Sequence, residues 1–155
     1  VNAAPNRLRF KGQCGEATIG ERRVLLLFPL TFMNNSGEAV SEAMRFYKLT
    51  PDRLLVLSDD ISLPVGAVRI RRKGSDGGQR GLRSIITLIG SSEFARIKIG
   101  VGQKPHPDYD LAAWVVSRFT AAERPLLDTA LKNAADAACL IAQGRTDEAM
   151  DRFSH

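Results

Sequence analysis

The sequence predicts an α/β domain in which helices pack on a mixed β-sheet. Short apolar runs typical of buried strands alternate with longer segments whose apolar residues recur at helical spacing. Polar groups follow several of these runs, as they do at the strand ends of α/β folds. The length of 155 residues, 44% of them hydrophobic, suits one globular core. We therefore expect a single domain over residues 1–155.

In the first half of the chain, a strand hairpin precedes a helix and a further strand. The predicted elements are strands over 9–19 and 22–29, a helix over 36–48 and a strand over 54–57. Gly20 and Glu21 supply the tight turn of the hairpin, and the apolar run that follows is expected to be buried. Ser36 is the predicted N-cap of the helix, and Pro51 follows its end. The run 54–57 is entirely apolar and predicts a central strand.

In the second half, strands and helices alternate. The predicted elements are a strand over 68–73, a helix over 81–89, a strand over 97–101, an apolar segment over 111–119, a helix over 120–141 and a short helix over 147–153. Gly90 and Gly144 close the first two of these helices. Thr120 and Glu123 form a capping box at the start of the long helix. The alternation favours a mixed sheet, because a parallel crossover needs a helix between its strands.

Composition restricts the possible partners. The formal charge of +5 and the pI of about 9.6 favour an anionic partner, although simple solubility explains them equally well. Cys14 and Cys139 lie in apolar surroundings and predict reduced core residues, and no spacing fits a zinc site. No apolar stretch approaches the ~20 residues of a membrane helix and no leader precedes Val1, so we expect a soluble cytoplasmic protein.

Three polar segments follow apolar runs and hold the candidate functional residues. They are TFMNNSG at 31–37, SDD at 58–60 and GSDGGQRG at 74–81. Since strand ends converge at one edge of an α/β sheet, we expect these segments to share one cleft. Asp59 and Asp60 could hold a metal, accept a phosphoryl group, orient a base or simply be solvated. The glycine segment lacks the ending of an NTP-binding loop; it could hold an anion or be a plain tight loop.

Basic residues alternate along the predicted strand 68–73. Arg69, Arg71 and Lys73 are therefore expected on one face of this strand, with Arg72 on the other. The basic face could grip phosphates. Equally, it could mark an exposed edge strand that its charge protects from unwanted pairing.

Four sequence runs, taken together and in order, resemble the bacterial peptidyl-tRNA hydrolases. The runs are LTFMNNSG at 30–37, LSDDISLPVG at 57–66, GGQRGLRSII at 77–86 and RIKIGVG at 96–102. The resemblance spans nearly the whole chain. It implies a three-layer α/β sandwich with a twisted mixed sheet, and an esterase that cleaves the bond between a peptide and the 3′-terminal ribose of tRNA. It also implies tRNA as partner, no metal or other cofactor, and a monomer.

The resemblance assigns roles to individual residues. Asp59 matches the carboxylate that steadies the imidazolium of a catalytic histidine. The implied substrate-binding residues are Phe32, Met33, Asn34, Arg71, Arg80 and Lys98. Of these, Asn34 positions water and substrate, and Arg71 and Lys98 clamp a tRNA phosphate. Arg80 stands where most members have asparagine, so a group that only donates hydrogen bonds replaces an amide.

The sequence departs from the family at its start. Family members begin with a strand, an Asn-Pro-Gly loop, a segment that supplies the catalytic histidine, and a helix; this sequence starts after them. An unusual initiator, processing or a truncated gene model would each explain Val1. Neither His106, between two prolines, nor the terminal His155 lies near a candidate segment. The expected result is a chain that binds tRNA weakly, does not hydrolyse it, and exposes apolar edges beside the missing strand.

Two other functions stay open. One is a non-catalytic RNA-binding relative, for which the family has a precedent in an organellar splicing factor. The other is a metal-dependent phosphohydrolase built on Asp59 and Asp60. An in-frame Asn-Pro-Gly and Arg-His-Asn segment in the DNA ahead of Val1 would favour the hydrolase.

Overall fold

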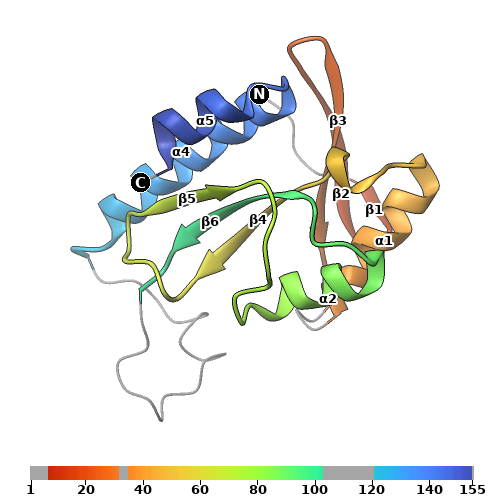
Figure 1. Cartoon of the computed structure of the whole chain (residues 1–155), viewed down its shortest axis with the longest axis horizontal. Coiled ribbons are helices and arrows are strands. Elements are labelled where there is room, and N and C mark those ends of the chain that lie inside the picture. Colours follow the sequence, from red (N-terminus) through yellow and green to blue (C-terminus); the bar gives the residue numbers. More distant parts are fainter. Residues whose placement is uncertain (1–6, 32–34, 103–120, 155) are drawn as a thin grey trace. The chain divides into compact units, whose positions relative to one another are not determined.

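The computed structural model describes residues 7–31, 35–102 and 121–154 (Figure 1). Its contacts divide the chain into two compact units. The first unit comprises 1–55, 72–95 and 142–144, and the second comprises 56–71, 96–141 and 145–155. The expectation of a single domain therefore stays a prediction. The segment 111–119, the capping residue Thr120, both histidines and Phe32, Met33 and Asn34 lie outside the described residues.

The first unit contains a three-stranded antiparallel sheet. Its strands are β1 (Arg7–Arg9), β2 (Gly12–Ile19) and β3 (Arg22–Pro29), in that spatial order. The predicted turn at Gly20 is confirmed, with φ of 63°. The prediction of one strand over 9–19 is wrong, because Phe10 and Lys11 have φ of 54° and 55° and form a second tight turn. Two left-handed residues make the turn that suits a two-residue hairpin.

Side-chain contacts explain why a turn forms without glycine or asparagine. Phe10 is 7% exposed, and its ring lies 5.9 Å from that of Tyr47. Lys11 donates a 2.8 Å hydrogen bond to Glu38, and this bond raises the pKa of Lys11. Both contacts reach helix α1 (Ser36–Tyr47), so packing of distant residues fixes the turn. Cys14, 1% exposed, joins the same core, as predicted.

Two helices complete the first unit. Helix α1 begins at Ser36, which is therefore the first helical residue and not the N-cap. Asn35 occupies the N-cap position but makes no side-chain capping bond. Helix α1 packs against α2 (Arg80–Ile89), which ends at Gly90 with φ of 74°, as predicted.

Strand β3 lies at one edge of its sheet among the described residues. Its apolar run was expected to be buried, yet Phe28 is 60% exposed and Val24 to Leu27 are only half-buried. The burial prediction is therefore wrong, because an outer strand has a neighbour on one side only.

The second unit contains the other three-stranded sheet. Its strands are β4 (Leu55–Asp60), β5 (Val68–Arg71) and β6 (Ala95–Gly100), with spatial order β4-β6-β5. The run 54–57 was predicted as a central strand, but among the described strands β6 is central and β4 forms an edge, where Leu57 is 48% exposed. Strand β4 also continues through Ser58 to Asp60, so these polar residues belong to the strand and do not follow it.

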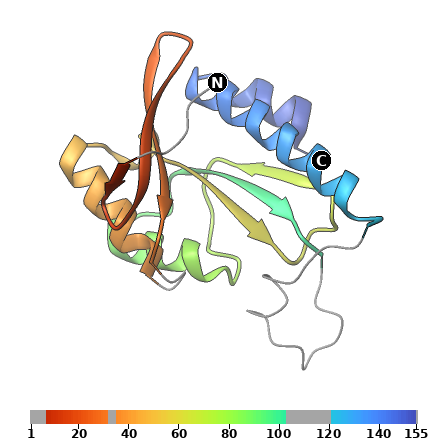
Figure 2. The same cartoon turned by 180° about the vertical axis from the view of Figure 1, so that it is seen from behind.

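Helices α4 (Arg124–Ala142) and α5 (Thr146–Phe153) belong mainly to this second unit and lie side by side in both views (Figures 1 and 2). Helix α5 packs against β5, where the Ile70 N–H donates a 2.9 Å hydrogen bond to Ser154 Oγ. One side of α4 is buried through small side chains, which allow close packing: Ala130, Ala134 and Ala137 are at most 1% exposed. None of the described helices is long and apolar enough to cross a membrane.

Candidate functional site

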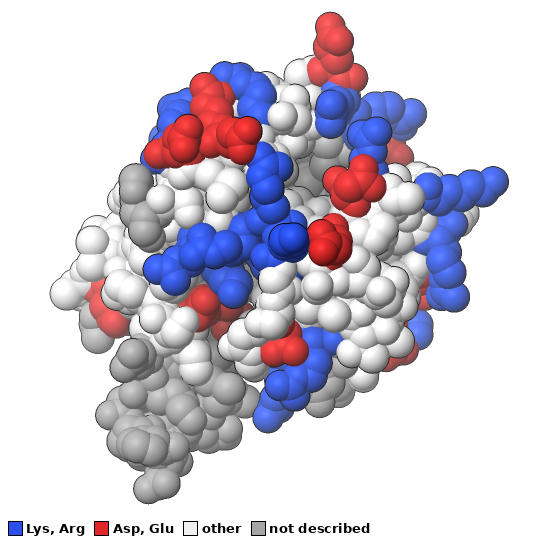
Figure 3. Space-filling view, viewed as in Figure 1, with Lys and Arg blue, Asp and Glu red and all other residues white. Residues whose placement is uncertain are grey.

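Strands β5 and β6 form a ladder with two chemically different faces. The antiparallel register sets Arg69 opposite Lys98 and Arg71 opposite Arg96. Opposed residues of a ladder share a face, so these basic residues stand together, and we call them the basic face. Figure 3 shows Lys and Arg side chains gathered over the β5 region. The sequence prediction that Arg69 and Arg71 share a face is confirmed.

Strand β5 ends at Arg71, so the basic face does not extend to Lys73 as predicted. Nor does Arg72 lie on the opposite face of the strand. The other face of the ladder carries Val68, Ile70, Ile97 and Ile99. Ile70 and Ile97 are fully buried, which fixes the orientation of both strands and so of the basic residues.

Arg96 is the member of the basic face that the sequence prediction missed. Its side chain is fully buried, and burial lowers the pKa of its guanidinium, although arginine keeps its proton at neutral pH. Arg71, opposite, is exposed. Among the described residues, no carboxylate pairs with Arg69, Arg71 or Lys98. Concentrated positive charge of this kind attracts anions.

Asp59 and Asp60 do not act as a pair. They are consecutive residues of β4, so their side chains point to opposite faces of the sheet. The Asp60 carboxylate accepts hydrogen bonds from the Ser62 N–H at 2.8 Å and the Ser62 hydroxyl at 2.6 Å, which gives it a role in the turn. Among the described residues no group of three potential metal ligands occurs. A shared metal at these two carboxylates is therefore not supported, and Asp59 alone is the candidate catalytic carboxylate.

The glycine segment satisfies its own hydrogen bonds. Gly77 and Gly78 have φ of 60° and 83°, and the Gly78 N–H donates to Asp76 Oδ1 at 2.7 Å. Gln79 is the N-cap of α2, and its side-chain oxygen accepts a 2.7 Å bond from the Leu82 N–H. Of the two interpretations from sequence, the tight loop fits these bonds better than an anion site. Arg80 is the exposed first residue of α2.

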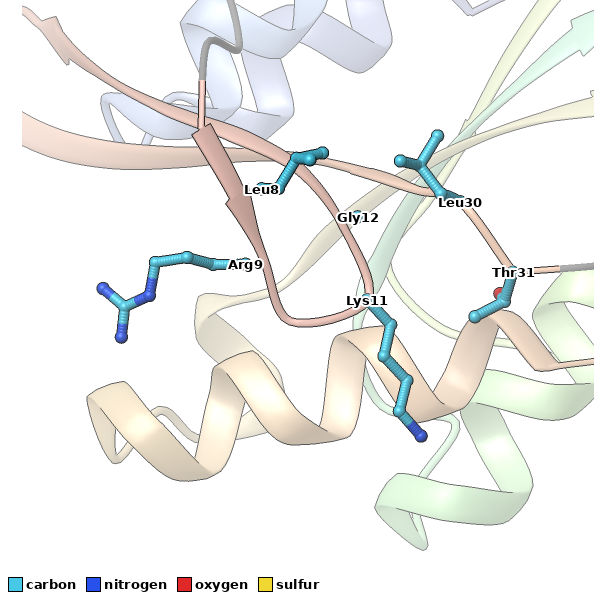
Figure 4. Close-up of a pocket in the computed structure, with 6 residues that line it drawn as sticks. All are labelled: Leu8, Arg9, Lys11, Gly12, Leu30 and Thr31. Atoms are coloured by element: carbon cyan, nitrogen blue, oxygen red, sulfur yellow. The ribbon is translucent and has the colours of Figure 1, made fainter.

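A hollow of about 430 Å³ lies where β3 ends, just before residues 32–34 (Figure 4). Its lining residues are Leu8, Arg9, Lys11, Gly12, Leu30 and Thr31. Leu8 and Leu30 are 75% and 60% exposed, so the hollow has an apolar rim. The Thr31 hydroxyl oxygen is buried and has no hydrogen-bond partner within the described part of the chain.

The predicted site residues divide between the two units. Arg80 and the residues that flank 32–34 belong to the first unit, whereas Asp59, Arg71 and Lys98 belong to the second. Within the second unit, the register brings Arg71 and Lys98 to one face. The expectation that all the segments share one cleft stays a prediction.

Comparison with known proteins gives one consistent result. The sequence profile of a family described as Peptidyl-tRNA hydrolase matches residues 2–155. The peptidyl-tRNA hydrolase of Agathobacter rectalis is 48% identical over 147 residues, which are 94% of this chain and 78% of the relative. That of Finegoldia magna is 42% identical over 154 residues, 99% of this chain and 80% of the relative.

Solved structures agree with the sequence comparison. The crystal structure of peptidyl-tRNA hydrolase from Acinetobacter baumannii superposes with a TM-score of 0.89 at 30% identity, covering 96% of this chain and 76% of that one. Its Arg119Gln mutant gives a TM-score of 0.90. The α/β class expected from the sequence is confirmed by the same superpositions. The chain belongs to the peptidyl-tRNA hydrolase family.

Proposed function

We propose that the protein hydrolyses the ester that joins a peptide, or an N-blocked amino acid, to the 3′ ribose of tRNA. The observation that carries the proposal is the family match over residues 2–155, a span that includes Asp59, Asn34, Arg71 and Lys98. The products are a free carboxylate and a tRNA with its 3′ hydroxyl restored. Such a reaction would take place in the cytoplasm, on a monomer that binds one tRNA.

The proposed chemistry is general-base catalysis by a histidine. The imidazole takes a proton from water as the water oxygen attacks the ester carbonyl, and later returns it to the leaving ribose oxygen. Asp59 would stabilise the imidazolium that forms between these steps. Asn34 would position the water and the ester, and Phe32 and Met33 would bind the terminal adenosine side of the substrate.

The basic face supports the tRNA part of the proposal. A phosphate beside Arg71 and Lys98 would receive charge-assisted hydrogen bonds from cations that no carboxylate neutralises within the described residues. Phosphate contacts fix the register of a nucleic acid without reading its bases. One enzyme could therefore accept many tRNAs.

One observation favours the second candidate, a non-catalytic RNA-binding relative. Gln79 and Arg80 replace the histidine and asparagine that most members have there, and Gln79 is occupied as a helix cap. A guanidinium at position 80 cannot accept a hydrogen bond from the substrate. If the family's asparagine at this position were indispensable for catalysis, the protein would bind tRNA but would not hydrolyse the ester.

The test is hydrolysis of N-acetyl-aminoacyl-tRNA by the protein at its natural length, with a chelator present. We expect release of the N-acetyl amino acid at an undiminished rate, since proton transfer by histidine needs no metal. Binding without hydrolysis would support the RNA-binding relative. Activity lost in chelator and restored by Mg²⁺ or Zn²⁺ would contradict the proposed mechanism and favour metal-dependent chemistry.

A further inference from the structure

A buried hydrogen bond ties the start of α1 to α2. The Gly37 N–H donates to Ser84 Oγ over 2.8 Å, between residues 47 positions apart in the chain. The first N–H groups of a helix have no partner within the helix, and the N-cap side chain usually supplies one. Here Asn35 makes no such bond. Ser84 on α2 therefore caps α1 from outside.

The two helices touch backbone to backbone at this bond. A Cβ built on Gly37 would stand 2.2 Å from Ser84 O and 2.9 Å from the Ile85 backbone nitrogen. Only glycine permits this approach. Ser84 itself is 8% exposed, so water does not replace its hydroxyl easily. The bond fixes the start of α1 against α2.

Both ends of the bond are close in the sequence to implied substrate-binding residues. Gly37 follows Asn34 by three positions, and Ser84 follows Arg80 by four positions, about one helical turn on the same face of α2. We propose that Ser84 is a positioning residue, which sets the spacing between the start of α1 and the start of α2. The inference rests on the proposed function, since it concerns how the same substrate is held.

Catalysis is sensitive to such spacing. A displacement of about 1 Å at a substrate-positioning group can reduce turnover by on the order of 10². Ser84→Ala leaves the buried Gly37 N–H without a partner, and α1 can then shift away from α2. Ser84→Ala should therefore reduce turnover of the bound substrate even under conditions where the variant remains folded. Phosphate binding at the basic face should not change, because Arg71 and Lys98 lie on β5 and β6.

The experiment compares Ser84→Ala with Ser41→Ala in the protein at its natural length. Ser41 is a half-buried serine of α1 whose hydroxyl bonds only to Glu38 O within the same helix, at 3.3 Å. Turnover of N-acetyl-aminoacyl-tRNA is measured at a temperature where circular dichroism shows each variant fully folded. The dissociation constant for uncharged tRNA and the hydrogen exchange rate of the Gly37 amide are measured on the same samples.

We expect Ser84→Ala to lower kcat by about tenfold or more, with the tRNA dissociation constant unchanged and Gly37 exchange about tenfold faster. Ser84→Thr, which keeps the acceptor, should restore most of kcat; Ser41→Ala should behave as wild type. If Ser84→Ala does not fold, Ser84→Cys should give a smaller loss of kcat, since a thiol accepts hydrogen bonds weakly. Equal kcat in folded Ser84→Ala and wild type would overturn the inference. Absence of hydrolysis by the wild type would instead refute the proposed function.

Discussion

Arg71 and Arg96 stand directly opposite each other on β5 and β6, the first exposed and the second fully buried. Like charges at opposed positions of a ladder repel each other. A phosphate beside the exposed Arg71 would be attracted by the positive charge on this face, which favours a polyanion over an uncharged partner.

The first prediction concerns the salt dependence of tRNA binding. Arg71→Ala should reduce the slope of log K against log salt concentration by about one unit, because one phosphate contact no longer releases a counterion. Lys132→Ala on α4 is the control, since Lys132 pairs with Asp136 at 3.4 Å and should leave the slope unchanged. Filter binding of tRNA over a range of salt measures both. An unaltered slope in Arg71→Ala would remove β5 from the tRNA footprint.

The second prediction separates the two adjacent carboxylates. Asp59→Asn should lower kcat by on the order of 10² while tRNA affinity stays close to wild type, as expected when an interaction made in the transition state is removed. Asp60→Asn should leave turnover near wild type, because Asp60 serves the turn at Ser62. Steady-state kinetics with N-acetyl-aminoacyl-tRNA tests both. Wild-type rates in Asp59→Asn would refute the catalytic assignment.

The third prediction concerns the cap of α2. Gln79→Ala should destabilise the protein by about 1 kcal/mol, since the Leu82 N–H loses its acceptor. Gln79→Glu keeps an acceptor and places a negative charge at the helix N-terminus, so it should preserve or raise stability. Urea unfolding at neutral pH measures the difference. Equal stability of the alanine variant and wild type would show that this cap contributes little.

The fourth prediction concerns acid stability. The Thr50 hydroxyl donates a hydrogen bond to the Asp52 carboxylate, and chiefly for this reason the pKa of Asp52 lies below its ordinary 3.8. A lowered folded-state pKa contributes stability that is present above the unfolded value and is lost as pH falls through the folded value. Thr50→Ala should therefore flatten the loss of stability below about pH 4.

Urea midpoints at neutral and acid pH provide the measurement for Thr50→Ala. Asp52→Asn supplies the control. In a protein that already carries Thr50→Ala, Asp52→Asn should change the pH dependence of stability little further, because the Asp52 carboxylate has already lost its partner. An acid slope in Thr50→Ala equal to that of wild type would contradict the prediction.

Local signals in the sequence located most elements of the fold. Gly20 and Gly90 ended their elements as expected, since each adopts the left-handed conformation that glycine favours. The turn at Phe10 and Lys11 could not be predicted, because neither residue favours positive φ and contacts with α1 hold the turn in place. Local sequence does not encode such contacts.

The site was predicted less completely than the fold. Alternation along the strand placed Arg69 and Arg71 on one face, but only the register of β5 and β6 sets Arg96 opposite Arg71, where its side chain is buried. Ser84 carried no signal either, because a serine in an amphipathic helix looks the same whether or not a distant N–H bonds to it. Contacts between segments that are remote in the sequence determine the positions of Arg96 and Ser84. Periodicity within one segment does not reveal such contacts.

The chemistry of the basic face would separate the salt dependence of tRNA binding from the pH dependence of ester hydrolysis. Arginine does not deprotonate under physiological conditions, so Arg69, Arg71 and Arg96 keep a constant charge across the pH range of a cell. The ionic strength of the solution would then govern how tightly tRNA is bound, whereas proton concentration would govern the ester chemistry alone. A pH–rate profile recorded at fixed salt would thus report the titration of the catalytic base without interference from a changing affinity for tRNA.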